Sequence, residues 1–212
     1  MKSMQAVISI GLLSALSMPL QAQELNLDAS ATIVSQYIFR GFDLNQEDPA
    51  IQGDVVWNHS SGLSLSVWGS NYDFGGDDGL EIDLVAAYSF KVNEMVSINI
   101  GLTEYTYSGD TDSSTEFNLG ASIRDFTITY YSDQDLDVDY LELNYAMPID
   151  DVSNLDFHVG RNSPDSGEDN NDFAISYSYR IKQATLFATY SKNDLDVEGA
   201  EDYLFAGATY AF

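Results

Sequence analysis

The fold is decided by the last stretch of the sequence, Asp202-Tyr203-Leu204-Phe205-Ala206-Gly207-Ala208-Thr209-Tyr210-Ala211-Phe212. Its residues alternate between two faces, as the side chains of a β-strand do. The face that includes the last residue consists of Leu204, Ala206, Ala208, Tyr210 and Phe212. As the edge strand of a soluble sandwich, this segment would expose a row of unpaired backbone N–H and C=O groups, to which another chain could pair. In a membrane β-barrel it would pair with the first strand, and no edge would remain.

Segments of about ten residues with the same alternation recur along the chain, and no helical period persists over a comparable length. We count twelve of them, at 27–40, 49–58, 63–72, 80–90, 96–107, 115–123, 126–132, 138–147, 155–161, 172–180, 184–191 and 202–212. Short turns alternate with longer, acidic loops, which is typical of an outer-membrane barrel with its short turns in the periplasm. The sequence therefore predicts an all-β chain that forms a transmembrane antiparallel up-and-down β-barrel of about twelve strands.

The two faces of these segments differ in character. One face is apolar in nearly every segment, and this alternation also places Tyr37 and Phe39 on it. The other face carries Gly, Ser, Thr, Asn and Tyr with scattered acids, which fits a wet lumen better than the charged surface of a soluble sandwich or lipocalin-like barrel. Rings at the short-turn ends predict a girdle at the lipid headgroups, formed by Trp57, Phe90, Phe126, Tyr145, Tyr179, Tyr210 and Phe212.

Residues 1–22 are expected to be a cleaved secretory signal. Lys2 precedes an apolar run from Ala6 to Met18 that is too short to span a bilayer, and Ala22 suits cleavage. Residues 23–212 would then form one outer-membrane barrel domain. The partners expected for it are outer-membrane lipids and lipopolysaccharide, the barrel-assembly machinery and small solutes.

Charge and cysteine content exclude several functions. The formal net charge of −26 excludes nucleic acid as a partner, because binding it requires a basic face. The sequence has no cysteine, so it has neither disulfides nor thiol chemistry. Acidic loop residues such as Asp110 and Asp112 lack the full spacing of a calcium loop, so we expect neither a metal site nor a cofactor.

Three blocks of sequence carry a family resemblance. They are Ser35-Gln36-Tyr37-Ile38-Phe39-Arg40-Gly41 with the following Pro49-Ala50-Ile51-Gln52-Gly53, then Val67-Trp68-Gly69-Ser70-Asn71, then Leu80-Glu81-Ile82-Asp83-Leu84. In order and spacing they resemble the TorF-type porin family of small Gram-negative outer-membrane proteins. Gln36 stands where that pattern usually has an acid, and Ala87 where it has glycine. The resemblance implies the class and the location of the protein rather than its substrate. Phe212 likewise resembles the C-terminal assembly signal of outer-membrane proteins.

The predicted lumen becomes aromatic and acidic toward the long loops. We predict that the pore-lining or constriction residues are Arg40, Trp68, Tyr72, Glu81, Asp83, Tyr105, Tyr107, Glu116, Tyr140, Glu142 and Tyr203. Tyrosine rings with carboxylates favour small cationic or neutral solutes, and acids outnumber Arg40 and Arg180 on the inner face, which predicts a cation-selective porin. The alternative is a non-conducting surface or structural barrel that its own rings fill.

An envelope enzyme is the third alternative. His158 faces the lumen beside Asp156, and Ser176 or Ser178 on the next segment would be the nearest serines. A hydrolase needs a nucleophile activated by such a base. Because no Ser/His pair lies on the lipid side, where a lipid esterase would need it, we expect no catalytic residues and no enzymatic activity.

Overall fold

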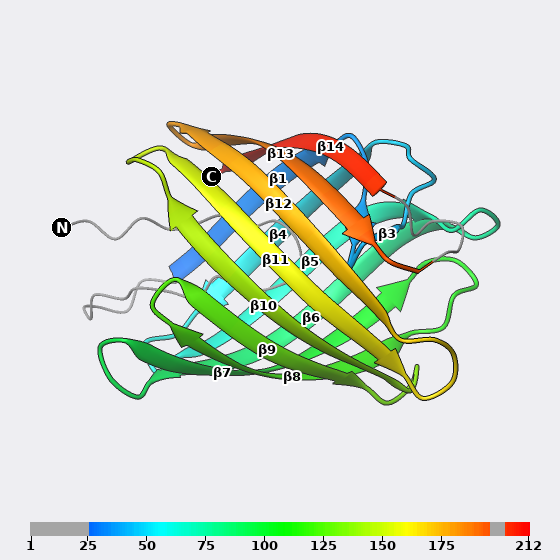
Figure 1. Ribbon diagram of the computed structural model, residues 1–212, viewed down its shortest axis with the longest axis horizontal. Helices are drawn as coiled ribbons and strands as arrows, with labels where there is room; N and C mark the ends of the chain where they lie inside the picture. Colours follow the sequence, from blue (N-terminus) through cyan, green and yellow to red (C-terminus); the bar gives the residue numbers. More distant parts are fainter. Residues whose placement is uncertain (1–25, 196–201) are drawn as a thin grey trace.

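The computed structural model describes residues 26–195 and 202–212, and the predicted signal at 1–22 lies outside these residues. They form a closed antiparallel barrel of twelve strands with a separate two-stranded hairpin (Figure 1). The strands are β1 (Asn26–Val34), β2 (Ile38–Phe39), β3 (Phe42–Asp43), β4 (Ala50–Asn58), β5 (Leu63–Asp73), β6 (Asp78–Lys91), β7 (Val96–Tyr107), β8 (Ser114–Ile123), β9 (Phe126–Asp133), β10 (Val138–Pro148), β11 (Ser153–Pro164), β12 (Asn170–Ile181), β13 (Ala184–Asn193) and β14 (Asp202–Ala211). The fold class predicted from the sequence is confirmed.

The last strand closes the barrel, as its sequence predicts. β14 pairs with β1 from Ser30 opposite Ala211 to Val34 opposite Gly207. The backbone N–H of Phe212 then donates to the carbonyl oxygen of Ala29 at 3.0 Å, a normal hydrogen-bond distance for a β-ladder. β1 also pairs with β4, and every other wall strand pairs with its neighbours in the chain. No strand edge of the wall is therefore left open.

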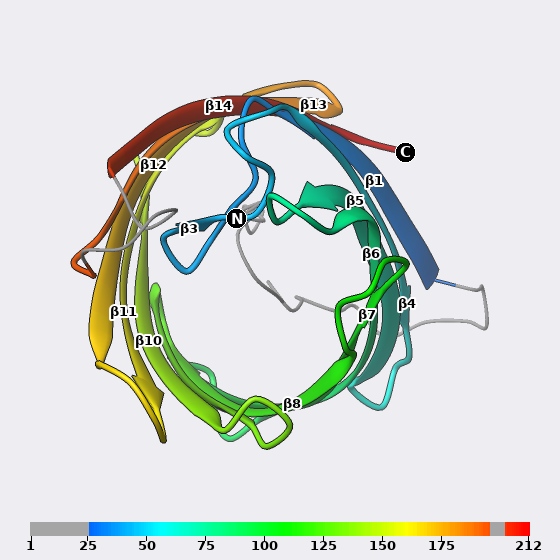
Figure 2. The same cartoon turned by 90° about the vertical axis from the view of Figure 1, so that its right-hand side faces the viewer.

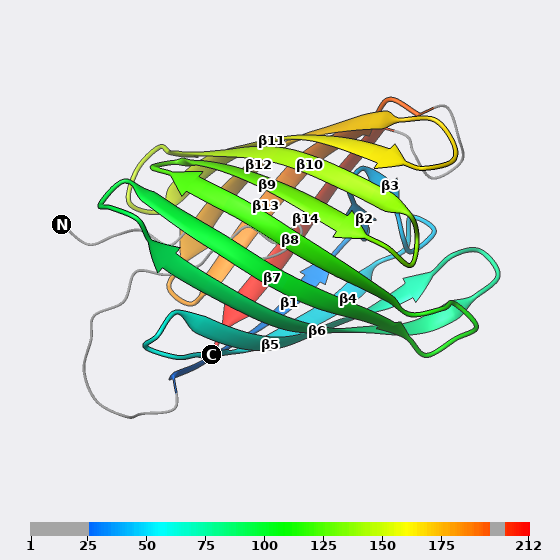
Figure 3. The same ribbon diagram turned by 90° about the horizontal axis from the view of Figure 1, so that it is seen from below.

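The barrel has two different rims. The short-turn rim is made by the connections 59–62, 92–95, 124–125, 149–152 and 182–183. The long-loop rim is made by 35–49, 74–77, 108–113, 134–137, 165–169 and the connection from β13 to β14. Figures 1 and 3 show the tilted strands running between these rims, with β3 near the long-loop rim. Several strands extend further toward the long-loop rim than predicted, β6 beginning at Asp78 and β11 ending at Pro164.

The outer surface is apolar and the inner surface polar, the reverse of a soluble protein. Leu204, for example, leaves 76% of its surface exposed, while the buried residues are mostly Thr, Ser, Asn, Asp, Glu and Tyr. Such an exterior suits lipid, because the closed ladder leaves no backbone group unpaired toward the hydrocarbon. At the short-turn rim, Phe126 stacks on Tyr145 with ring centroids 4.5 Å apart.

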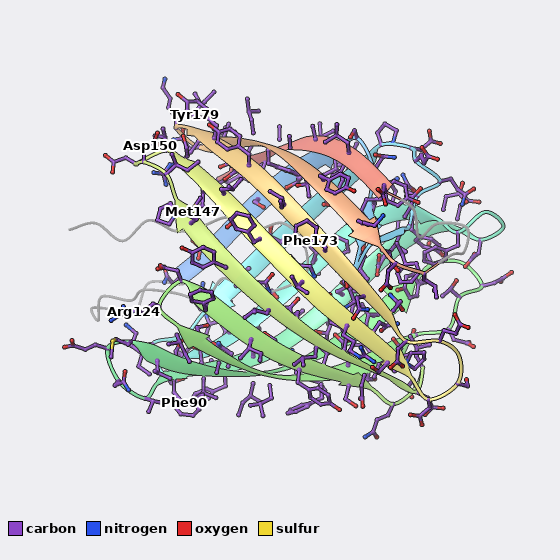
Figure 4. All side chains as sticks on the ribbon, in the orientation of Figure 1. Phe90, Arg124, Met147, Asp150, Phe173 and Tyr179 are labelled. Atoms are coloured by element: carbon purple, nitrogen blue, oxygen red, sulfur yellow. The ribbon has the colours of Figure 1, made fainter. Side chains whose placement is uncertain are left out.

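The side chains in Figure 4 follow the same division. The labelled rings of Phe90 and Tyr179 lie on the outside at the short-turn rim, near Arg124, Met147 and Asp150. Among the described residues, none forms a helix long and apolar enough to cross a membrane.

The prediction for the first segment, 27–40, was wrong. The wall strand β1 ends at Val34, and residues 35–49 turn into the barrel, where β2 and β3 form a hairpin inside the ring of strands (Figure 2). Tyr37, placed on the outer face by alternation, is only 8% exposed and lies inside. Alternation cannot separate a strand that continues in the wall from one that bends into the lumen, because both keep a period of two.

Candidate pore constriction

The inner hairpin, residues 35–43, is held against one side of the wall. Its side chain Ile38 packs with Tyr203 and Phe205 of β14. Phe39 pairs with Phe42 across a tight turn in which Arg40 and Gly41 have φ of 50° and 78°. Such a turn favours glycine at the second position.

The tip of the hairpin fits closely on β12 and β13. A Cβ at Gly41 would lie 2.9 Å from the Cβ of Asn193 and 3.1 Å from that of Asp172. The amide of Asn193 donates to the carbonyl of Arg40 at 3.1 Å. The hairpin is therefore docked on the wall by its backbone as well as by its side chains.

Arg40 extends from this tip to the far side of the lumen. Its Nη1 and Nη2 donate to Oε2 and Oε1 of Glu116 on β8 at 2.8 and 3.0 Å, a bidentate pair. The Tyr105 hydroxyl donates to the same carboxylate at 3.0 Å. Since β8 is separated from β13 by β9 to β12, this ion pair bridges the interior of the barrel.

Aromatic rings surround the guanidinium group. Its carbon lies 4.1 Å from the ring centroid of Tyr140, 4.8 Å from that of Tyr131 and 4.7 Å from that of Phe39. These are cation–π distances, which are most favourable where water is partly excluded. The bridge across the lumen is thus both an ion pair and an aromatic contact.

A second contact joins the hairpin to β6. The Tyr37 hydroxyl donates to Oε2 of Glu81 at 2.9 Å, and the Tyr107 hydroxyl donates to Oε1 at 3.0 Å. The Tyr37 ring also lies 5.7 Å from the ring of Trp68. The lumen carboxylates are thus held by phenols, which are strong donors that carry no charge.

The same pattern continues on β9 to β12. Tyr131 donates to Glu142 at 2.9 Å, and Tyr140 donates to Asp172 at 2.9 Å. His158 Nε2 lies 2.8 Å from Asp172 Oδ1, and its Nδ1 lies 2.7 Å from the amide oxygen of Asn144. A cavity of about 30 Å³, room for a water-sized molecule, separates this cluster from the hairpin.

No catalytic arrangement is found around His158. Within residues 26–195 and 202–212 its hydrogen-bond partners are Asn144, Tyr140 and Asp172, and none is a serine. Ser176 instead accepts a hydrogen bond from Thr189 at 2.8 Å. Nor do three or more His, Cys, Asp or Glu side chains in the described ranges come together as a metal site.

Most of the predicted constriction residues fall into two groups around the hairpin. Arg40, Glu116, Tyr105, Tyr140 and Glu142 surround the hairpin tip, and Glu81, Tyr107 and Trp68 surround its base. Tyr203 forms part of the wall under Ile38.

Tyr72 lies outside these two groups, at the long-loop rim. Its hydroxyl donates to Asp77 at 3.2 Å, and its ring lies 4.5 Å from Phe74. Arg180, the second cation predicted for the lumen, is exposed at the short-turn rim and donates to the carbonyl of Asp151 at 2.7 Å. Of these two arginines, Arg40 lies in the constriction and Arg180 does not.

Sequence reasoning missed Tyr37, Ile38 and the His158–Asp172 pair. Tyr37 and Ile38 were assigned to a wall strand. The residues Phe39-Arg40-Gly41-Phe42 do carry a signal for the turn. Two residues that end in glycine stand between two aromatic residues, and glycine is favoured at the second position of a two-residue hairpin loop.

The closed twelve-stranded barrel, with an apolar exterior and a polar interior, defines a porin-like fold. The family described as "Bacterial protein of unknown function (Gcw_chp)" matches residues 21–206, and the chain belongs to this family. That match does not confirm the TorF-type name. A search of curated proteins found no match.

Several solved structures share the fold. The KdgM porin matches with a TM-score of 0.67 and 12% identity, over 87% of this chain and 99% of that chain. The NanC porin matches with a TM-score of 0.59 and 12% identity, over 87% and 97%. The outer membrane protein Omp33 of Acinetobacter baumannii matches with a TM-score of 0.57 and 9% identity, over 91% and 100%. Two of these three are named as porins and the third as an outer membrane protein.

Proposed function

We propose that this protein is an outer-membrane porin that passes small cationic or neutral solutes through a narrow, acidic and aromatic constriction. The observation that carries the proposal is the hairpin of residues 35–43, held inside the lumen by the Arg40–Glu116 pair. A loop that narrows the lumen while the wall stays closed makes a selective passage out of a wide one. The fold shared with the KdgM and NanC porins supports this reading.

The size of the barrel makes the charges of its wall effective. Twelve strands spaced about 4.8 Å apart and tilted by about 40° give a backbone diameter of roughly 24 Å. Inward side chains and the hairpin reduce this to a passage on the order of 10 Å, close to the Debye length of about 10 Å at 0.1 M salt. A solute in the passage would therefore feel every charge on the wall.

Those charges are mostly negative. Against Arg40, the inner face carries Asp28, Asp54, Glu81, Asp83, Glu116, Glu142, Asp156 and Asp172. Carboxylates that line a pore admit cations and exclude anions. One structure of the KdgM porin is described as a complex with oligogalacturonate, a polyanion. The acidic lumen here disfavours such a substrate, so the shared fold serves a different solute.

Planar-bilayer recording of the refolded protein tests the proposal. We expect small, steady conductance steps and a reversal potential of cationic sign in a KCl gradient, with selectivity falling as the salt concentration rises. A reversal potential of anionic sign would overturn the cationic assignment while leaving the porin intact.

A non-conducting barrel is the second candidate, and the close packing of the hairpin favours it. Deleting residues 37–43 separates the two candidates. A porin conducts before the deletion and more strongly after it, whereas a plugged barrel conducts only after it. Migration of the unboiled protein ahead of the boiled form on an SDS gel shows in each case that the barrel has folded.

The proposal also covers location and assembly. The apolar exterior and the girdle would contact outer-membrane lipids and lipopolysaccharide, and Phe212 would be recognised by the barrel-assembly machinery after export. Fractionation of a Gram-negative host should recover the protein in the outer membrane. Recovery in the soluble periplasmic fraction would contradict this part.

A further inference from the structure

Asp83 differs from the other carboxylates of the constriction. Glu81, Glu116 and Glu142 each accept hydrogen bonds from tyrosine or arginine side chains. Asp83 lies among them on β6 and is 4% exposed, yet its Oδ1 has no hydrogen-bond partner in the described part of the chain. Leaving a buried carboxylate oxygen without a hydrogen-bond donor costs free energy. A ligand that donates a hydrogen bond to this oxygen would recover that free energy.

Two aromatic residues flank Asp83. In the strand register, Asp83 is directly opposite Trp68 on β5 and directly opposite Tyr105 on β7. Directly opposite side chains on one face have Cβ atoms about 4.5–5.5 Å apart, so both rings lie beside the carboxylate. Organic cations favour a carboxylate that has aromatic residues beside it.

Two further buried polar atoms near Asp83 lack partners among the residues that the structure describes. They are Oγ1 of Thr103, which is 0% exposed, and Nδ2 of Asn118, which is 5% exposed. Thr103 on β7 is opposite Val85, two residues from Asp83, and also opposite Glu116 on β8. Asn118 follows Glu116 on the same face of β8. Unused hydrogen-bonding groups therefore extend from Asp83 across three adjacent strands.

The local charge favours a cation. Glu116 is balanced by its bidentate pair with Arg40. Within residues 26–195 and 202–212, Glu81 receives its hydrogen bonds from the uncharged phenols of Tyr37 and Tyr107, so its negative charge adds to that of Asp83. A divalent metal would require more oxygen ligands than this arrangement brings together.

We propose that Asp83 is a binding site for small primary ammonium ions on their way through the constriction, with Trp68 and Tyr105 as the aromatic residues on either side of it. This inference rests on the proposed porin function and names its solute class. The ammonium N–H groups donate to Asp83, the rings of Trp68 and Tyr105 face the alkyl-ammonium, and Thr103 and Asn118 bind polar groups that the solute carries.

The fluorescence of Trp68 tests the site without any need for conduction. The sequence has two tryptophans, so Trp57→Phe leaves Trp68 as the only reporter. Titrating this refolded protein with ethylammonium should give a saturable change in fluorescence. Replacing Asp83 by Asn in the same background should raise the half-saturating concentration about tenfold, as expected for one lost hydrogen bond to a charged group.

The matched control is Asp156→Asn. Asp156 is also a lumen carboxylate, 8% exposed, but it accepts a hydrogen bond from Asn154 and lies toward the short-turn rim. We expect this variant to leave the titration unchanged. Tetramethylammonium, which has no N–H donor, should give a weaker response that Asp83→Asn does not alter.

Three outcomes would overturn the site: no saturable response to ethylammonium, equal effects of the two substitutions, or equal responses to the two ions. Bilayer current separates this failure from that of the porin itself. A conducting, cation-selective protein without the Trp68 response keeps the proposed function and loses the site. A protein that does not conduct loses the proposed function, whatever Trp68 reports.

Discussion

The two halves of the barrel differ in the side chains that line their interiors. Toward the long-loop rim the interior is crowded with carboxylates, phenols and the hairpin. Toward the short-turn rim the interior holds small hydroxyl groups, such as Ser122 and Thr127 at 3.1 Å, and the rings gather outside. From this comparison we infer that the long-loop half, where the hairpin lies, selects solutes by charge, and that the short-turn half carries the features for assembly in lipid. Changes in one half should therefore spare the task of the other.

Deletion of Phe212 should have the largest effect, and on assembly alone. Its ring lies 5.2 Å from that of Tyr210 on the exposed outer surface, where lipid and the assembly machinery would meet it. We expect a several-fold loss of heat-modifiable protein from the outer membrane, with aggregated or degraded protein in the periplasm. Protein that does insert should conduct as before. Normal insertion would show that the short-turn half does not carry the assembly signal.

Glu116→Gln should destabilise the constriction but spare assembly. It leaves the Arg40 guanidinium in the lumen without its carboxylate, at a cost of about 2–3 kcal/mol, below the usual cost for a fully buried pair because the Arg40 side chain is 15% exposed. The hairpin should loosen, which current noise in bilayers would detect. Asp54→Asn is the control in the wall, because Asp54 accepts from Ser30 and pairs with no cation. Equal noise in both variants would contradict the role of the bridge.

The contributions of the two halves to ion selectivity can be compared directly with two double variants. Glu81→Gln together with Asp83→Asn removes two carboxylates next to the hairpin. Asp28→Asn together with Asp156→Asn removes two from the short-turn half. The first pair should move the reversal potential toward zero clearly more than the second, since a fixed charge acts most strongly where the passage is narrow. Equal shifts would mean that the narrowest point lies elsewhere.

The smallest effect should come from Asp77, in the loop 74–77 above the barrel. Hydrogen bonds from the hydroxyl of Thr111 and from the backbone N–H of Asp110 lower the pKa of this carboxyl below its ordinary value of 3.8. A lowered pKa means that the contact is fully present at neutral pH and is lost as the pH falls through that pKa. The protection factors of residues 108–113, which compare the measured hydrogen-exchange rate with the intrinsic rate at the same pH, should therefore be high at pH 7 and fall as the pH drops through the lowered pKa.

Asp77→Asn provides the control for this pH dependence. The variant should show the lower protection factors at both pH values, because its amide keeps only part of the accepting capacity. The constriction should not respond in either case. A change in the conductance of Asp77→Asn would show that the loop is coupled to the lumen.

Much of the wall could be predicted from the sequence, because a strand between lipid and water must alternate at every step. β7, at Val96–Tyr107, has the bounds that its sequence predicts. The same rule failed after Val34, where Tyr37 and Phe39 keep the alternation although they lie inside. The position of the hairpin depends on its contacts with Glu81, Tyr203 and Asn193, which are remote in sequence. The pairing of each carboxylate with its own donor likewise follows from the register and could not be foreseen.

The docking of Ile38 on β14 has a consequence for the order of folding. The hairpin belongs to the connection that follows the first wall strand, but the surface that holds it, Tyr203 and Phe205, comes from the last. A chain whose final strand has not yet paired lacks the surface of Tyr203 and Phe205 on which Ile38 packs. The backbone N–H of Ser35 also donates to the carbonyl of Ala206 at 2.9 Å, so a second contact of this connection depends on the same strand. The hairpin can therefore reach its full set of contacts only in a closed barrel.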